Sequence, residues 1–186
     1  MSGLENDTIG GFNGFVKKQA ELGPTILTTV LFDDQYEILH KCIDAKHAVL
    51  TGETYFTRGS TALLDAVGKT IKKVGKRLSE TPEDNRPGKV IFVITTDGQE
   101  NASRKFSYGD VKRMISHQTD KYGWEFIFMG ANIDVAKEGR SLGIGAANTY
   151  SFNASSRGVG EMYRMAGAAC FAKRSIIPHK KKAEKV

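Results

Sequence analysis

The apolar stretch Val90-Ile91-Phe92-Val93-Ile94 runs directly into Thr95-Thr96-Asp97-Gly98. Five consecutive large apolar residues are typical of a strand that is buried on both faces of a parallel sheet. In open sheets of this kind, ligands bind beyond the carboxyl ends of the strands. Asp97 is therefore a carboxylate at the position where such a site forms, although a simple Asp-Gly turn explains the same residues equally well.

Helix and strand patterns alternate on both sides of this stretch. The clearest helical stripe comprises Leu63, Leu64, Val67, Ile71 and Val74, at the spacing of one helix face. Further helices are expected near residues 4–16, 107–122, 134–142 and 155–170, and further strands at 25–32, 36–43, 125–129 and 149–152. This order predicts an α/β fold, namely an open doubly wound (Rossmann-like), mostly parallel sheet with helices on both faces.

The composition indicates one soluble domain. Of the 186 residues, 40% are hydrophobic and 26% are charged, which is the balance of a globular protein. No apolar run approaches the roughly 20 residues that a membrane span requires, and the N-terminus lacks the features of a secretory signal. Because the chain also has only two cysteines, Cys42 and Cys170, we expect a cytoplasmic protein without disulfides and without a membrane partner.

The positive charge is concentrated at the C-terminal end of the chain. Residues 173–186 hold six lysines or arginines and one glutamate, a net charge of +5, which leaves about +1 of the total of +6 for residues 1–172. We therefore expect a single domain over residues 1–175 and a basic tail over residues 176–186. The nearly neutral domain argues against nucleic acid as its partner, so a nucleic-acid accessory role through the tail is a lesser alternative.

A second polar segment precedes the clearest helix. Arg58-Gly59-Ser60-Thr61 leads into the apolar stripe that starts at Leu63. A hydroxyl at such a position commonly caps the N-terminus of a helix, and the segment by itself favours that interpretation. Its oxygen is also a ligand of the kind that hard cations such as Mg²⁺ prefer.

Three other groups of residues are weaker candidates for a site. Gly68-Lys69-Thr70 ends like a phosphate-binding loop, but it lies inside a helix instead of before one. His40, Cys42 and His47 are not followed by the second ligand pair of a structural metal site. Asp33-Asp34 resembles a phosphotransferase pair, but a polar hairpin turn explains it with less strain.

Together, two of these segments resemble a known family. The run Gly59-Ser60-Thr61-Ala62-Leu63-Leu64-Asp65-Ala66-Val67, followed by a buried strand that ends in Thr96-Asp97-Gly98, is similar to the von Willebrand factor A (vWA) family, and most of all to its small bacterial and phage members. The resemblance covers most of residues 1–153. It implies a metal-ion-dependent adhesion site (MIDAS), in which Thr61 and Asp97 bind Mg²⁺ or Mn²⁺ and an acidic group of a protein partner completes the shell of the cation.

The chain departs from this family at its N-terminus. The first helical stripe begins at Leu4, with no strand before it, although a helix in a doubly wound fold normally connects two parallel strands. The family's opening Asp-x-Ser-x-Ser motif often continues Gly-Ser-Met, and Met1-Ser2-Gly3-Leu4 resembles the family sequence from that methionine onward. The resemblance thus implies that the first central strand and its three ligands would lie upstream of residue 1. A late gene start, a shortened chain or a degenerate family member would each explain this departure.

From these patterns we predict a non-enzymatic protein-interaction domain with a remnant of the cation site at Thr61 and Asp97. One carboxylate and one hydroxyl under-coordinate Mg²⁺, so binding by this chain should be weak or absent. The alternative is a magnesium-dependent hydrolase or phosphotransferase that uses Asp97, or Asp33 and Asp34, although no histidine or cysteine lies beside an obvious activating partner. In the vWA family the first strand is central and pairs with both neighbours, so the resemblance implies that the sheet is interrupted between the strands at 25–32 and 90–94. Unpaired edges of this kind should favour self-association.

Overall fold

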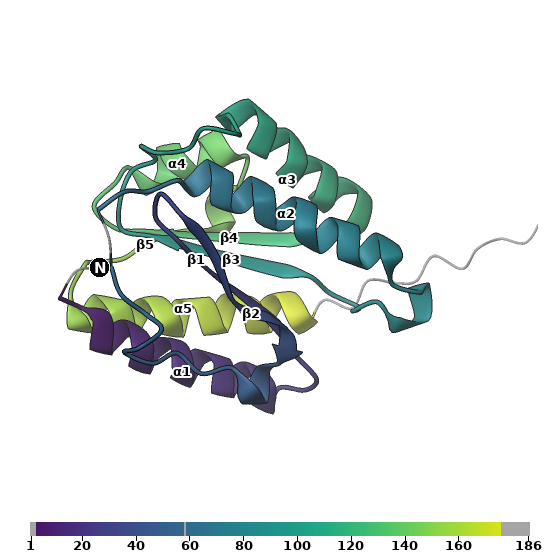
Figure 1. Ribbon diagram of the computed structural model, residues 1–186, viewed down its shortest axis with the longest axis horizontal. Helices are drawn as coiled ribbons and strands as arrows, with labels where there is room; N and C mark the ends of the chain where they lie inside the picture. The colour runs from purple at the N-terminus through teal and green to yellow at the C-terminus, as the bar shows by residue number, and fades with distance from the viewer. Residues whose placement is uncertain (1–2, 58, 176–186) are drawn as a thin grey trace, which may run out of the picture.

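The helices and strands of the chain occupy the expected positions. The computed structural model describes residues 3–57 and 59–175, so the basic tail expected at 176–186 lies outside the described residues. The helices are α1 (Glu5–Glu21), α2 (Leu63–Glu80), α3 (Tyr108–Tyr122), α4 (Val135–Leu142) and α5 (Ser156–Ser175). The strands are β1 (Ile26–Phe32), β2 (Tyr36–Asp44), β3 (Ile91–Thr96), β4 (Glu125–Gly130) and β5 (Thr149–Ser151). Figure 1 shows these elements in order along the chain.

Local capping fixes the ends of α3 and α4. The hydroxyl of Ser107 accepts the backbone N–H of Asp110, whose carboxylate in turn accepts the N–H of Ser107, so the expected capping box is confirmed. Asp134 accepts the N–H of Lys137 at the start of α4. The helix ends at Gly143, whose φ of +81° is the left-handed conformation that glycine adopts without a Cβ penalty.

The strands form two sheets in the described part of the chain. β3, β4 and β5 make a parallel sheet, with Ile91 to Thr96 paired in register with Glu125 to Gly130. β1 and β2 make an antiparallel hairpin around the turn at residues 33–35, as the sequence predicts. No ladder joins β1 to β3 among residues 3–57 and 59–175. The expected interruption between these two strands is therefore present.

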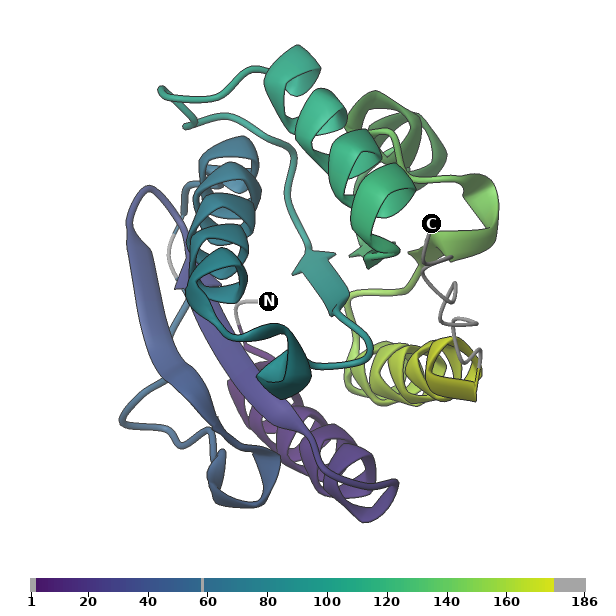
Figure 2. The ribbon, with the colours of Figure 1, turned by 90° about the vertical axis from the view of Figure 1, so that its right-hand side faces the viewer.

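Helices cover both faces of the parallel sheet. α2, α3 and α4 lie on one side and α1 and α5 on the other (Figure 2). The first layer packs on a core that includes Phe126 and Phe128, and α5 packs on Ile127 and Met129. Because successive side chains of a strand point to opposite faces, β4 supplies both cores. This arrangement confirms a mixed α/β fold with a parallel sheet flanked by helices, which is compatible with the Rossmann-like class.

Burial differs sharply from strand to strand. All residues of β4 after Glu125 are buried, whereas β1 contains no buried residue and Ile26 is 64% exposed. The expectation that residues 90–94 are buried on both faces is wrong in part, because only Ile94 of this run is buried and Val93 is 36% exposed. The other residues of the run are not buried because, in the described part of the chain, no strand pairs with β3 on the side that faces β1.

No helix within residues 3–57 and 59–175 is both long enough and apolar enough to cross a membrane.

Candidate functional site

The structure brings the loops of Thr61 and Asp97 together at the carboxyl end of the sheet. The hydroxyl oxygen of Thr61 lies 2.9 Å from the point where a Cβ on Gly98 would stand, so a larger residue after Asp97 would collide with it. Both Thr61 and Asp97 are half-buried and line the same cavity. The adjacency of their two loops is as expected, while the role of Thr61 and Asp97 as metal ligands stays a prediction.

Backbone hydrogen bonds hold three loops at this edge. The carbonyl oxygen of Thr61 accepts the N–H groups of Asn101 and Ala102, at 3.0 and 3.3 Å. The N–H of Thr61 donates to the side-chain oxygen of Asn101 at 2.9 Å. The next residue, Ala62, donates to the carbonyl oxygen of Asp33 at 2.6 Å. The loops after β1 and β3 are thus both tied to the segment that enters α2.

The expected helix cap before α2 is not formed by a hydroxyl. The N-cap residue is Ala62, which makes no side-chain capping bond. Instead, the carboxylate of Glu100 accepts the N–H of Leu64 in the first turn of α2 at 2.9 Å. In the described part of the chain the hydroxyl of Thr61 makes no hydrogen bond. The hydroxyl of Thr61 therefore does not cap α2, which is the structural role that this segment by itself favoured.

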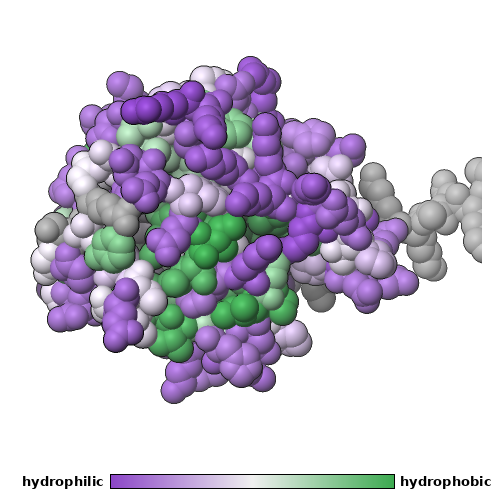
Figure 3. Space-filling model, viewed as in Figure 1, coloured by the Kyte–Doolittle hydropathy of each residue, from purple (hydrophilic) through white to green (hydrophobic). Residues whose placement is uncertain are grey.

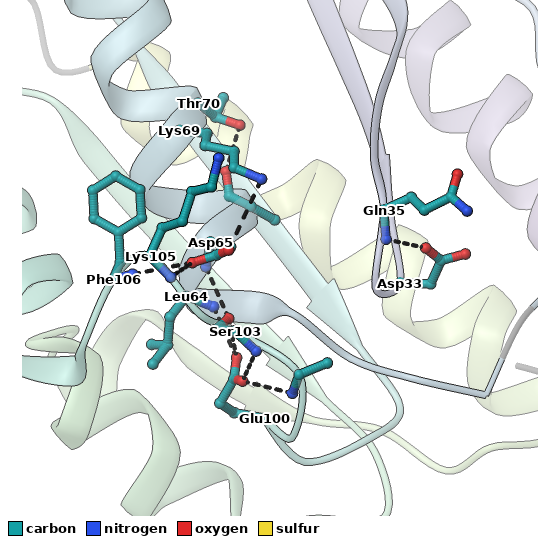
Figure 4. Close-up of polar contacts among 12 residues, drawn as sticks. Asp33, Gln35, Leu64, Asp65, Lys69, Thr70, Glu100, Ser103, Lys105 and Phe106 are labelled. Atoms are coloured by element: carbon teal, nitrogen blue, oxygen red, sulfur yellow. Dashed lines mark hydrogen bonds and ion pairs between the residues drawn. The ribbon is translucent and has the colours of Figure 1, made fainter.

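Glu100 was missed by the sequence reasoning, and it organises the loop after β3. Its carboxylate also accepts the N–H groups of Ala102 and Ser103, at 3.0 and 2.8 Å, and the hydroxyl of Ser103 at 2.8 Å (Figure 4). Four donors on one carboxylate fix this loop against the start of α2. A useful signal was its position three residues after Asp97, where an acidic side chain can reach a nearby helix N-terminus.

Asp65 is a second carboxylate that the sequence reasoning passed over. Its side chain is buried, at 7% exposure, and accepts the N–H groups of Lys105 and Phe106 at 2.8 and 3.0 Å (Figure 4). Burial opposes its ionisation, but these donors and the ammonium group of Lys69 at 3.9 Å outweigh it and hold the pKa below the usual value. An aspartate between buried apolar neighbours in a helical stripe was the available signal.

The other candidate residues have local partners. His40 shares a 2.9 Å hydrogen bond with the hydroxyl of Thr29 on the neighbouring strand. The carboxylate of Asp33 accepts the N–H of Gln35, as expected of a polar turn. Gly68-Lys69-Thr70 lies inside α2. Within the described ranges, no group of three or more histidine, cysteine, aspartate or glutamate side chains is placed to hold a metal ion.

A large cavity opens beside the Thr61–Asp97 edge. It has a volume of about 1250 Å³ and lies between β1 and β3, and all residues of both strands line it. Figure 3 shows apolar residues gathered over the β1–β2 hairpin, between α2 and α1. The candidate site thus has two connected parts, which are a polar edge with Thr61 and Asp97 and an apolar groove that leads away from it.

Comparison of the chain with known protein-family models, with curated proteins and with solved structures finds no match in any of the three.

Proposed function

We propose that residues 1–175 act as a non-enzymatic protein-interaction domain of the vWA type. The proposal rests on the polar edge, where a half-buried hydroxyl on Thr61 and a carboxylate on Asp97 come from adjacent loops. These oxygens are suitable ligands for Mg²⁺ or Mn²⁺. An acidic side chain of a protein partner would complete the coordination, so that binding of the cation and of the partner strengthen each other.

The observation that carries the proposal is the position of the Thr61 hydroxyl. It lies against Gly98, and it is released from helix capping because Glu100 accepts the N–H of Leu64. A threonine that is half-buried, adjacent to the loop of a carboxylate and without a hydrogen bond from its hydroxyl among residues 3–57 and 59–175 is suited to be a cation ligand. With only these two protein groups, the domain alone should bind the cation weakly, at about millimolar concentration.

Paramagnetic broadening by Mn²⁺ in ¹H–¹⁵N spectra tests this proposal, because it detects weak binding at named amides. We expect the signals of residues 60–62 and 97–99 to broaden first. Asp97→Ala and Thr61→Ala should abolish this pattern. Asp120→Ala removes an exposed carboxylate on α3 and should leave the pattern intact, so it is the matched control.

Two results would contradict the proposed cation site. One is the absence of selective broadening in the wild-type chain at millimolar Mn²⁺. The other is broadening that survives in Asp97→Ala, since it would place the cation on other carboxylates.

A further inference from the structure

β1 and β3 each present an unpaired edge to the same cavity. Among residues 3–57 and 59–175, β1 pairs with β2 on one side only, and β3 pairs with β4 on one side only. Backbone N–H and C=O groups alternate between the two sides of a strand, so each strand turns a row of donors and acceptors toward the cavity. Exposed edges of this kind are templates for the addition of a strand.

The two edges also run in the same direction. The carbonyl of Asp33, just after β1, accepts the N–H of Ala62 at 2.6 Å. Gly98, just after β3, contacts the neighbouring Thr61. Both strands therefore end at the same edge of the molecule, and one added strand can pair in parallel with both.

The length and volume of the cavity suit one strand of about six residues. Neighbouring strands lie about 4.8 Å apart, so a single strand fills a gap of about 10 Å between two others. β1 has seven residues and β3 has six, which corresponds to a length of about 20 Å. The cavity extends along the whole of both strands and has a volume of about 1250 Å³.

The lining defines the chemistry of such a strand. Val67 and Val74 of α2 line the cavity on one side, and Val16 of α1 and Cys170 of α5 line it on the other. Thr8, Gln19 and Thr70 also line the cavity, but the cover on both faces is mainly apolar. An added strand would therefore itself be mainly apolar.

The end of the cavity where β1 and β3 begin is basic. Arg174 donates to the hydroxyl of Thr25 and the carbonyl of Gly23, both neutral acceptors. Arg77, in the last turn of α2, lines the same end. In the described chain neither guanidinium is paired with a carboxylate. A segment that enters at this end in parallel orientation would be favoured by acidic residues at its amino end.

We propose that the groove between β1 and β3 binds an extended segment of a partner protein, about six apolar residues long and preceded by acidic residues. The segment becomes the central strand, pairs in parallel with β1 and β3, and joins the two sheets into one. This names the partner class of the interaction domain, but it does not depend on the cation site. The chain's own residues 176–186 do not have this chemistry, since they include Pro178 and four lysines.

A synthetic peptide tests the proposal on the full-length chain. The probe is Asp-Glu-Val-Ile-Val-Ile-Val-Val with a fluorophore at its amino end, and EDTA is present so that failure of the cation site cannot affect the result. We expect saturable binding by fluorescence anisotropy. Affinity should fall at least about tenfold for each of two control peptides. In one, Lys-Lys replaces Asp-Glu, so that the basic end of the cavity repels the peptide. In the other, proline replaces the second isoleucine, so that a backbone donor is lost.

A pair of matched variants locates the binding site. Val93→Lys places a charge in the groove, at a residue that is 36% exposed and lines it. Val49→Lys makes the same change at an exposed valine that does not line the groove. We expect the first variant to lose at least about tenfold in affinity and the second to bind like the wild type. The two control peptides on the wild-type chain give the same test without any risk to folding.

Hydrogen exchange distinguishes the remaining outcomes. Bound peptide should protect alternate amides of both β1 and β3. Protection confined to the outer edges of β2 or β5 would overturn the proposal, as would no binding or equal binding of all three peptides. A dimer in sedimentation with β1 and β3 already protected would also overturn it, because the occupant would then be a second copy of the chain.

Discussion

β4 and β1 flank β3 on opposite sides, and they illustrate two different states of a strand. β4 lies between β3 and β5, and its residues 126–130 are all buried. β1 lies across a cavity from β3, and none of its residues is buried. Both strands are rich in large apolar residues, so composition does not separate them. What separates them is whether a neighbour pairs with each edge.

This difference shows that helices on two faces do not complete a sheet. α2 and α5 cover the parallel sheet on opposite faces, yet a strand facing an open edge keeps exposed apolar surface and unpaired backbone groups. The closed half of the molecule, from β3 to β5, should therefore carry most of the stability. The half that contains the groove should be stabilised by a molecule that supplies the additional strand.

The largest expected difference between the two halves comes from one substitution made twice. Ile127 in β4 is 0% exposed and Ile26 in β1 is 64% exposed. We expect Ile127→Ala to lower the free energy of unfolding by about 2–5 kcal/mol through lost burial and a new cavity. Ile26→Ala should cost no more than about 0.5 kcal/mol. Urea denaturation measures both, and equal costs would mean that β1 is packed in solution.

A smaller effect is expected at Asp65, which anchors α2 to the loop before α3. Asp65→Ala leaves the N–H groups of Lys105 and Phe106 without their acceptor, which should cost about 2 kcal/mol at neutral pH. Because the folded-state pKa is lowered, this contribution is present above the unfolded-state pKa of about 3.9 and is lost as the pH falls through the folded-state pKa.

Denaturation of wild type and Asp65→Ala as a function of pH measures this contribution. The difference in unfolding free energy should shrink below about pH 4. A difference that stays constant down to about pH 2 would show that the carboxylate charge contributes nothing. The unfolding free energy of Asp65→Asn, which keeps one acceptor oxygen, should lie between those of the wild type and Asp65→Ala at neutral pH.

The smallest effect is expected at Glu125, which ties the start of β4 to its neighbours. Its carboxylate oxygens lie 3.2 Å from the ammonium group of Lys89 and 2.9 Å from that of Lys173. Burial opposes ionisation, but the two ammonium groups prevail and lower the pKa. Since ion pairs near the surface contribute little, Glu125→Gln should cost about 0.5–1 kcal/mol. Calorimetric melting measures it, and a cost as large as that of Ile127→Ala would contradict the view that apolar burial holds the closed half.

Local sequence signals predicted the order of elements and most of their ends. The capping box of Ser107 and Asp110 and the stop at Gly143 depend on residues within a few positions of each other. These features depend on short-range periodicity. The absence of a strand before the first helix followed from the rules of strand connection, but the position of the break between β1 and β3 was expected only from the resemblance to the vWA family, in which the first strand is central.

Contacts between loops that are distant in sequence could not be predicted. Glu100 caps α2 from 36 residues away, and Asp65 binds backbone groups 40 and 41 residues away. No periodicity reports such pairs. The prediction that a hydroxyl near Thr61 caps the helix was wrong for this reason, since a carboxylate from another loop took that role.

Hydrogen exchange of the free chain tests the central claim, which is that the groove between β1 and β3 is open. The account predicts that the amides of residues 126–130 in β4 exchange most slowly. Alternate amides of β1 and β3, those that face the groove, should exchange on the order of 100-fold faster, because no strand in the described part of the chain pairs with them. Protection along both edges of β1 equal to that of β4, in a chain shown to be monomeric, would mean that β1 and β3 pair directly and would contradict the account.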